Sequence, residues 1–363
     1  QDSPFRNLII NGDMQVAQRA TSTSGVADAS DEGYNSLDRF GLYYYGGEGG
    51  AATMSQDTTV PSDTSYGVQR KSLKVDVTTA DTSIGATGII ALKHTVEAQY
   101  IHHSGWDYTS SSANITLSFW ARSVKAGTYC VLFRCHDASG ERYYVKEYTL
   151  VANTWKHIIF TVPGDSNLVF NADNGEGFEI RWILACGNDR NDATANTWFA
   201  PGSDYDNSTS NQVNFYDHTD NNFFLTGVQL EVGDTASDFE HLPHDVQLQR
   251  CKRYYQLISK TNGDAIGQGT HYNSTAIYMS EGIHPEMRAT PTLATVGGTN
   301  YFIRYSNGGN DYFDNFALDS STGPAYIEFY ASSGQNHSGG TAGHACFCRT
   351  ADASAVFAID AEL

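Results

Sequence analysis

"GVQLEVGDTASDFEHLPHDVQLQRCKRYYQ", from Gly227 to Gln256, changes its hydrophobic pattern halfway along. The first residues alternate between apolar and polar side chains, which is typical of a strand with one buried face. From Asp245 onward the apolar residues recur at helical spacing, and Asn262-Gly263 supplies a stop. The stretch therefore predicts that a strand-rich region ends here and that one short helix, over 241–259, follows it.

Strand patterns lie on both sides of this helix. Alternating runs, most of five to nine residues, are separated by Gly, Asn, Asp and Ser, as a β-sandwich requires. The clearest runs are SLKVDVTT (72–79), NITLSFWARS (114–123), GTYCVLFRC (127–135), RYYVKEYTL (142–150), AIYMSEGI (276–283), NYFIRYS (300–306), YIEFYAS (326–332) and GHACFCRT (343–350). The sequence thus predicts an all-β protein of two antiparallel, jelly-roll-like β-sandwiches, a large one over 1–240 and a smaller one over 260–363, joined by the helix.

The net charge of −19 excludes several kinds of partner. Nearly all non-specific affinity for nucleic acid comes from Lys and Arg, so we expect no nucleic-acid partner. An anionic membrane surface is disfavoured for the same reason. No stretch approaches the length of apolar sequence that spans a bilayer, so we expect no membrane insertion.

Four segments together resemble a family of bacteriophage tail-fibre and receptor-binding proteins of the marine-phage type. They are NLIINGDMQVAQR (7–19), SFWARS with KAGTYCV (118–131), ANTW with FTVPGD (152–165) and the stretch 227–256. NLIINGD (7–13) and TGVQLEVG (226–233) also resemble the first and last strands of jelly-roll carbohydrate-binding modules. HPEMRATPT (284–292) and the ending FAIDAEL (357–363) resemble the head domains of phage fibres.

This resemblance implies a virion protein of a phage tail, made in the host cytoplasm, with other tail proteins as partners. We therefore predict a non-enzymatic adhesin that recognises a bacterial surface structure, most simply a glycan. Two alternatives stay open, a structural connector or decoration protein of the phage particle and a polysaccharide depolymerase. No catalytic motif singles out any of the 41 acidic residues, so we expect no enzyme.

Two aromatic clusters are the candidate ligand-binding residues. Tyr43, Tyr44 and Tyr45 form one cluster, and Trp106 with Tyr108 forms the other. Sugars present C–H faces that stack on aromatic rings, which favours such clusters in loops and at strand ends. The competing interpretation is that alternate aromatic residues of a strand pack into the core.

The resemblance also implies a parallel homotrimer, and the helix is the candidate interface. The residues that it would present to the other chains are Val246, Cys251, Tyr254, Tyr255 and Ile258. Three such helices side by side would bury the face that a sandwich leaves uncovered. The competing interpretation is a helix packed wholly against its own domain.

We expect no cofactor and no metal. The one alternative is calcium, because Asn11 and Asp13 near the start and Glu231 near the last strand of the large domain offer hard oxygen ligands. A solvated turn and a carboxylate at a strand edge explain the same residues, and we prefer that explanation.

Overall fold

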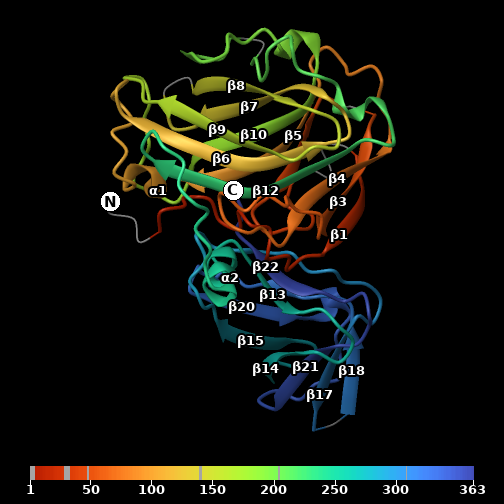
Figure 1. Cartoon of the computed structure of the whole chain (residues 1–363). Helices are drawn as coiled ribbons and strands as arrows, with labels where there is room; N and C mark the ends of the chain where they lie inside the picture. Colours follow the sequence, from red (N-terminus) through yellow and green to blue (C-terminus); the bar gives the residue numbers. More distant parts are fainter. Residues whose placement is uncertain (1–4, 28–32, 47–48, 139–140, 203–204, 308) are drawn as a thin grey trace. The chain divides into compact units, whose positions relative to one another are not determined.

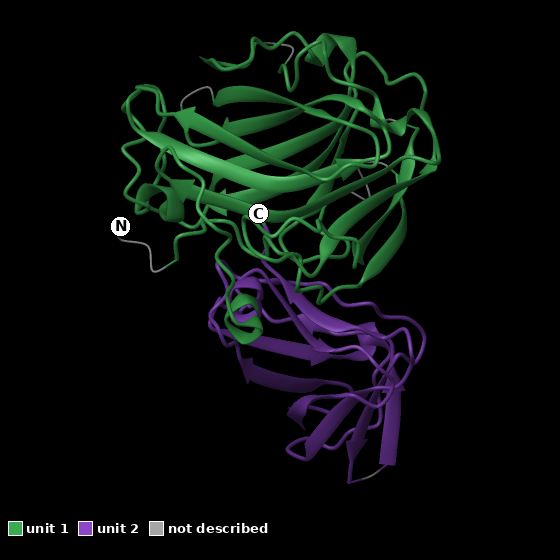
Figure 2. Cartoon of the chain, in the orientation of Figure 1, with its two compact units in different colours: residues 1–247, 363 green, residues 248–362 purple. Residues whose placement is uncertain are grey.

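The computed structural model describes residues 5–27, 33–46, 49–138, 141–202, 205–307 and 309–363. The chain divides into two compact units, residues 1–247 with 363 and residues 248–362 (Figure 2). Each unit has a hydrophobic core of its own. Within the described residues, no helix has both the length and the hydropathy that crossing a membrane requires.

The first unit consists of two six-stranded antiparallel sheets (Figure 1). The first sheet contains, in spatial order, β1 (Ser22–Val26), β3 (Ala51–Asp57), β4 (Ser72–Thr79), β12 (Asn222–Val232), β6 (Asn114–Ser123) and β9 (Lys156–Pro163). The second sheet contains β11 (Trp198–Phe199), β8 (Arg142–Leu150), β7 (Gly127–Cys135), β10 (Glu176–Cys186), β5 (Ile89–Glu97) and β2 (Gly41–Tyr45). The helical segments of this unit are α1 (Ala98–His102), η1 (Asn188–Arg190) and η2 (Phe215–Asp217).

Alternate residues of both sheets meet in the core between them. Leu117 and Phe119 of β6 and Ile180 and Trp182 of β10 are fully buried members of this core. The rings of Phe119 and Trp182 meet edge to face, with their centroids 5.8 Å apart. Because side chains of a strand alternate between its two faces, burying these residues turns their neighbours in sequence to the outer faces of the sandwich.

Gly227, the first residue of the stretch quoted above, lies at a β-bulge in β12. The pairing of β12 with β6 shifts register between Thr226 and Gln229, and Gly227 has a φ of +61°. A Cβ atom at this position would lie 3.1 Å from Cδ1 of Trp120 and 3.2 Å from Cδ of Gln69. A larger residue is therefore disfavoured here both by the positive φ and by the close approach of these two side chains.

The second unit is also built from antiparallel sheets. A three-stranded sheet contains β13 (Tyr255–Ser259), β22 (Phe357–Asp360) and β16 (Thr292–Leu293). A seven-stranded sheet contains β18 (Gly309–Phe313), β17 (Phe302–Ser306), β21 (Ala345–Thr350), β14 (Ala265–His271), β15 (Ile277–Gly282), β20 (Tyr326–Ala331) and β19 (Ala317–Leu318). One further helical turn, η3, spans Ser333–Gln335. Both units are thus all-β, and the predicted fold class is confirmed.

The predicted helix is shorter than its sequence pattern indicated. α2 spans His244–Lys252, and the chain then turns and enters β13 instead of continuing helically to 259. Tyr255 pairs with Asp360 at the other end of the second unit's sequence. The prediction of a helix over 241–259 is wrong in its second half, because this distant strand offers backbone hydrogen bonds that a local pattern cannot reveal.

Because α2 ends at Lys252, the residues predicted to form the trimer interface do not all lie on a helix. Cys251 and Tyr254 are 0 % exposed and Tyr255 is 3 % exposed within the single chain. Val246 is half-buried and Ile258 is 37 % exposed. Of the five residues predicted to pack between three chains, only these two keep accessible surface, so a helical bundle through all five is not supported. The homotrimer itself stays a prediction.

Candidate ligand-binding site

A pocket of about 480 Å³ lies on the outer face of the second sheet, and we call it the arginine pocket. Its lining residues are Tyr43, Tyr45, Ile89, Arg134, Glu141, Tyr143, Arg181, Arg190, Tyr205 and Asn207. Most of them lie on strands that contribute their other face to the core, which fixes their positions. The connection from β10 to β12, which contains the short strand β11, supplies Arg190, Tyr205 and Asn207.

This connection is held against the outer face of the sheet by side-chain hydrogen bonds. The Cys130 N–H of β7 donates to Oε1 of Gln212 at 2.7 Å, and Nε2 of Gln212 donates to the Ile183 carbonyl of β10 at 3.1 Å. Nη1 of Arg181 donates to Oδ1 of Asn207 at 3.1 Å. A small apolar cluster on the same face, including Leu132, is buried as a result. The arginine pocket lies at the edge of the part of the sheet that this connection covers.

An ion-pair network forms one wall of the pocket. Arg134 binds Glu141 through two N–H···O contacts, Nη2 to Oε1 at 2.6 Å and Nε to Oε2 at 3.1 Å. Nη1 of Arg134 also lies 3.5 Å from Oε2 of Glu179, whose other oxygen accepts from Nε of Arg181. Register explains the contact, because Arg134 and Glu179 are direct partners across β7 and β10.

These contacts keep both glutamates ionised. Burial alone would raise the pKa of Glu179, but the charges of Arg181 and Arg134 outweigh burial and lower it below its usual value. The pKa of Glu141 is lowered in the same way, burial being outweighed by the hydrogen bonds and charge of Arg134. Each carboxylate in this wall of the pocket is therefore already paired with a guanidinium group.

Tyrosine rings lie against two of the three arginines in the pocket, Arg181 and Arg190. The guanidinium carbon of Arg181 lies 3.8 Å from the ring centroid of Tyr43. That of Arg190 lies 4.7 Å from the ring of Tyr45 and 5.7 Å from the ring of Tyr205. Each distance is within the range at which a cation is attracted to an aromatic face. Tyr45 and Tyr205 are each 45 % exposed, so their rings are accessible from the pocket.

The structure separates the three consecutive tyrosines predicted as one cluster. Tyr43 and Tyr45 line the arginine pocket, whereas Tyr44 points into the core and is 2 % exposed. The Tyr44 hydroxyl lies 2.8 Å from that of Tyr216, with which it shares a hydrogen bond. Core packing, the competing interpretation, therefore holds for Tyr44, and ligand contact stays a prediction for the other two.

The second predicted cluster lies mostly inside the protein. Trp106 is 3 % exposed, belongs to the core and donates its indole N–H to the Ala113 carbonyl at 3.1 Å. Tyr108 is half-buried, and its ring meets Phe170 edge to face at 5.0 Å. Neither residue lines the arginine pocket. Trp106 is thus a core residue, and Tyr108 packs against that core.

The arginines of the pocket were missed at the sequence level, although one signal was present. β10 contains Glu179 and Arg181 at alternate positions, with apolar residues at 178, 180 and 182–186. Two charges on one face of a strand whose other face is apolar indicate a polar site on that face. No comparable local signal marks Arg190 or Tyr205.

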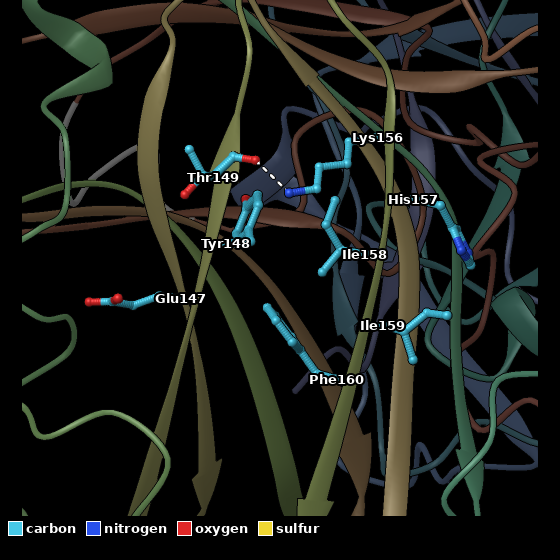
Figure 3. A pocket seen from close by; sticks show the side chains of 8 residues that line it. All are labelled: Glu147, Tyr148, Thr149, Lys156, His157, Ile158, Ile159 and Phe160. Atoms are coloured by element: carbon cyan, nitrogen blue, oxygen red, sulfur yellow. Dashed lines mark hydrogen bonds between the residues drawn. The ribbon is translucent and has the colours of Figure 1, made fainter.

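A second pocket, of about 430 Å³, lies between β8 of the second sheet and β9 of the first (Figure 3). Ile158 and Phe160 point toward β8, whereas the side chain of Glu147 points away from β9. Nζ of Lys156 donates to the Thr149 carbonyl at 2.9 Å, as the dashed line in Figure 3 shows. Lys156, the lysine of this pocket, is thus already hydrogen-bonded within the protein. The pocket resembles an opening between the edges of two sheets.

Two of the three residues of the calcium alternative, Asn11 and Glu231, are engaged in other contacts. The Asn11 side chain is hydrogen-bonded to the backbone of Val16. Both oxygens of Glu231 accept hydrogen bonds from Ser237, and Arg6 lies 3.5 Å away. Across the described residues, no group of three or more His, Cys, Asp or Glu side chains is arranged to hold a metal ion.

No family model matches the chain, and no curated protein matches it either. Similar solved structures include one described as "CBM4 structure and function", at 14 % identity and a TM-score of 0.31, covering 62 % of this chain and 99 % of the other. A putative sugar-binding protein from Bacteroides thetaiotaomicron has 12 % identity and a TM-score of 0.34, covering 62 % of this chain and 100 % of the other.

A third similar structure is the enzymatically active domain of bacteriophage CBA120 tailspike protein 4, at 12 % identity and a TM-score of 0.31. It covers 64 % of this chain, which in turn spans only 22 % of that chain. Likenesses with TM-scores of this size carry no argument about ligand or activity. What the structure itself defines is a two-unit β protein with an arginine- and tyrosine-lined pocket on one sheet.

Proposed function

We propose that this protein is a non-enzymatic glycan-binding protein and that a sugar binds in the arginine pocket. The observation that carries the proposal is the pairing of two half-exposed rings, Tyr45 and Tyr205, with the Arg190 side chain in one concave site. Aromatic faces stack on the C–H faces of sugars, and N–H and O–H groups beside them bind the hydroxyls.

The state of the two glutamates supports binding without catalysis. A glycosidase needs one carboxylic acid that stays protonated long enough to donate its proton to the leaving group. Glu141 and Glu179 have lowered pKa values, and both are paired with arginines. Neither is suited to act as that acid.

The biological setting rests on the tail-fibre resemblance of residues 7–256. We propose on that basis that the chain belongs to a phage tail, is assembled into the virion with other tail proteins as a homotrimer, and recognises a glycan on the surface of a bacterium.

A glycan array and binding to a panel of bacterial strains test this proposal. We expect wild-type protein to bind, and Tyr45→Ala to weaken binding by about tenfold, because it removes a stacking ring. Tyr312→Ala is the matched control, since Tyr312 is 50 % exposed but lies on β18 of the other unit. Absence of binding to every glycan and strain would favour a structural connector, and release of reducing ends from bound polysaccharide would favour a depolymerase.

A further inference from the structure

The arginine pocket contains one cation that no described carboxylate neutralises. Arg134 pairs with Glu141 and Glu179, and Arg181 pairs with Glu179. In the part of the chain that the structure describes, the guanidinium of Arg190 takes part in no ion pair and no hydrogen bond, and its buried Nε has no acceptor. Three arginines thus face two glutamates, and the unmatched charge belongs to Arg190.

This unmatched charge is costly to maintain. Arg190 is only 9 % exposed, and a cation largely shielded from water without a partner is destabilising. The rings of Tyr45 and Tyr205 offset part of that cost, since an aromatic face attracts a cation. The backbone holds the residue in place, because the Arg190 carbonyl accepts hydrogen bonds from the N–H groups of Asn207 at 2.7 Å and Ser208 at 3.3 Å.

We propose that the glycan bound in the arginine pocket carries an anionic substituent, a carboxylate or a sulfate, and that Arg190 binds this group. The inference rests on the proposed function and names the class of sugar. A planar guanidinium offers parallel N–H donors whose spacing matches the oxygens of such anions, and these charge-assisted contacts are stronger than neutral ones. The two tyrosine rings then hold the sugar beside the charged group.

The charge of the rest of the protein makes this site selective. With a net charge of −19, the chain as a whole repels anions at long range. An acidic glycan is therefore attracted only where a short-range contact outweighs that repulsion, and Arg190 supplies it. Added salt screens both effects, so binding should depend on salt much less than it does for a basic protein surface.

A purely structural role for Arg190 is the rival explanation, in which the side chain only supports the two tyrosine rings. The second unit offers a matched control for that role. The guanidinium carbon of Arg349 lies 5.1 Å from the ring of Phe347 and 5.9 Å from that of Tyr305, yet Arg349 is exposed to water. Arg349→Gln therefore removes an arginine stacked on aromatic rings without touching the arginine pocket.

The experiment measures wild-type protein, Arg190→Gln, Arg190→Lys and Arg349→Gln on one glycan array and by affinity electrophoresis. The polymer probes are polygalacturonate for carboxylate, dextran sulfate for sulfate and dextran for a neutral chain. We expect the wild type to bind acidic glycans at least about tenfold more tightly than neutral ones. Arg190→Gln should lose that preference, Arg190→Lys should keep part of it, and Arg349→Gln should behave as the wild type.

Each outcome bears on a different claim. No binding by the wild type to any glycan overturns the proposed function together with this inference. Binding confined to neutral glycans, or a preference for acidic ones that survives Arg190→Gln, overturns the inference alone. If Arg190→Gln does not fold, the Nε–H resonance of Arg190 is followed by NMR in wild-type protein during a titration with the acidic glycan, and an unchanged resonance at saturation refutes direct binding.

Discussion

We expect His157 to make the stability of the first unit depend on pH. Its ring stacks on Tyr66, with centroids 3.8 Å apart, and lies 4.9 Å from the ring of Trp120. Burial lowers the pKa of His157 from 6.5 to about 4, and the charge of Asp63 opposes this only in part. The unfolded chain therefore binds the proton more tightly than the folded chain does.

The sign of the effect follows from this difference. Stability contributed by the neutral ring is fully present above pH 6.5 and is lost progressively as the pH falls from 6.5 toward 4. The two pKa values differ by an amount that corresponds to about 3 kcal/mol. Because the ring is only half-buried and water screens part of the effect, we expect a loss of about 2 kcal/mol.

The assay compares urea unfolding of the wild type and His157→Gln at several pH values, followed by tryptophan fluorescence. All five tryptophans lie between residues 106 and 198, so this signal reports the first unit alone. The free energy of unfolding of the wild type should fall by about 2 kcal/mol more than that of the variant between about pH 7 and pH 4.5. His218→Gln removes an exposed imidazole from the same unit and serves as the control.

Parallel curves for the wild type and His157→Gln would refute this reasoning. They would mean that attraction between the imidazolium and the faces of Tyr66 and Trp120 compensates for lost hydration. An NMR titration of the His157 ring then gives the pKa directly and separates the two explanations.

Two further predictions concern backbone conformation and assembly. Gly227→Ala should lower the free energy of unfolding by about 2 kcal/mol or more, because it adds steric contact to an unfavourable positive φ. Gly25→Ala, at a φ of +74° with no described atom within 4 Å of an added Cβ, should cost about half as much, and equal losses would refute the steric explanation. Light scattering should give three times the chain mass of 39.7 kDa, whereas a monomer mass at micromolar concentration excludes the homotrimer. If the trimer uses the accessible residues near α2, Val246→Asp with Ile258→Asp should dissociate it, and an intact trimer would place the interface elsewhere.

The strands of the first unit were predictable to the residue where turn residues bound an alternating pattern. β4, β6, β7 and β8 begin and end where the sequence alone placed them. The end of α2 was not predictable in this way. Tyr254, Tyr255 and Ile258 continue the helical spacing, but the partner that draws Tyr255 into a strand is Asp360, far away in the sequence. A local pattern contains no information about such a partner.

The candidate site was predictable only in part for a similar reason. Alternation indicated that Tyr44 faces the opposite side of β2 from Tyr43 and Tyr45, but not which side is the core. Arg190 and Tyr205 reach the pocket through a connection that folds back over the sheet, so their meeting with Tyr45 depends on tertiary structure. The charged side chains of such a connection look like ordinary solvent-exposed residues in the sequence.

The two walls of the arginine pocket differ in how freely they can change during evolution. Tyr43, Arg134 and Arg181 lie on strands whose opposite faces build the core, so the register of a whole sheet depends on their neighbours. Arg190 and Tyr205 lie on the connection from β10 to β12, on either side of the two-residue strand β11, where substitutions leave the pairing of the longer strands untouched. A lineage can therefore exchange one acidic sugar for another, or for a neutral one, by altering that connection alone. The same property makes the connection the natural place to diversify in a library that seeks binders for new glycans.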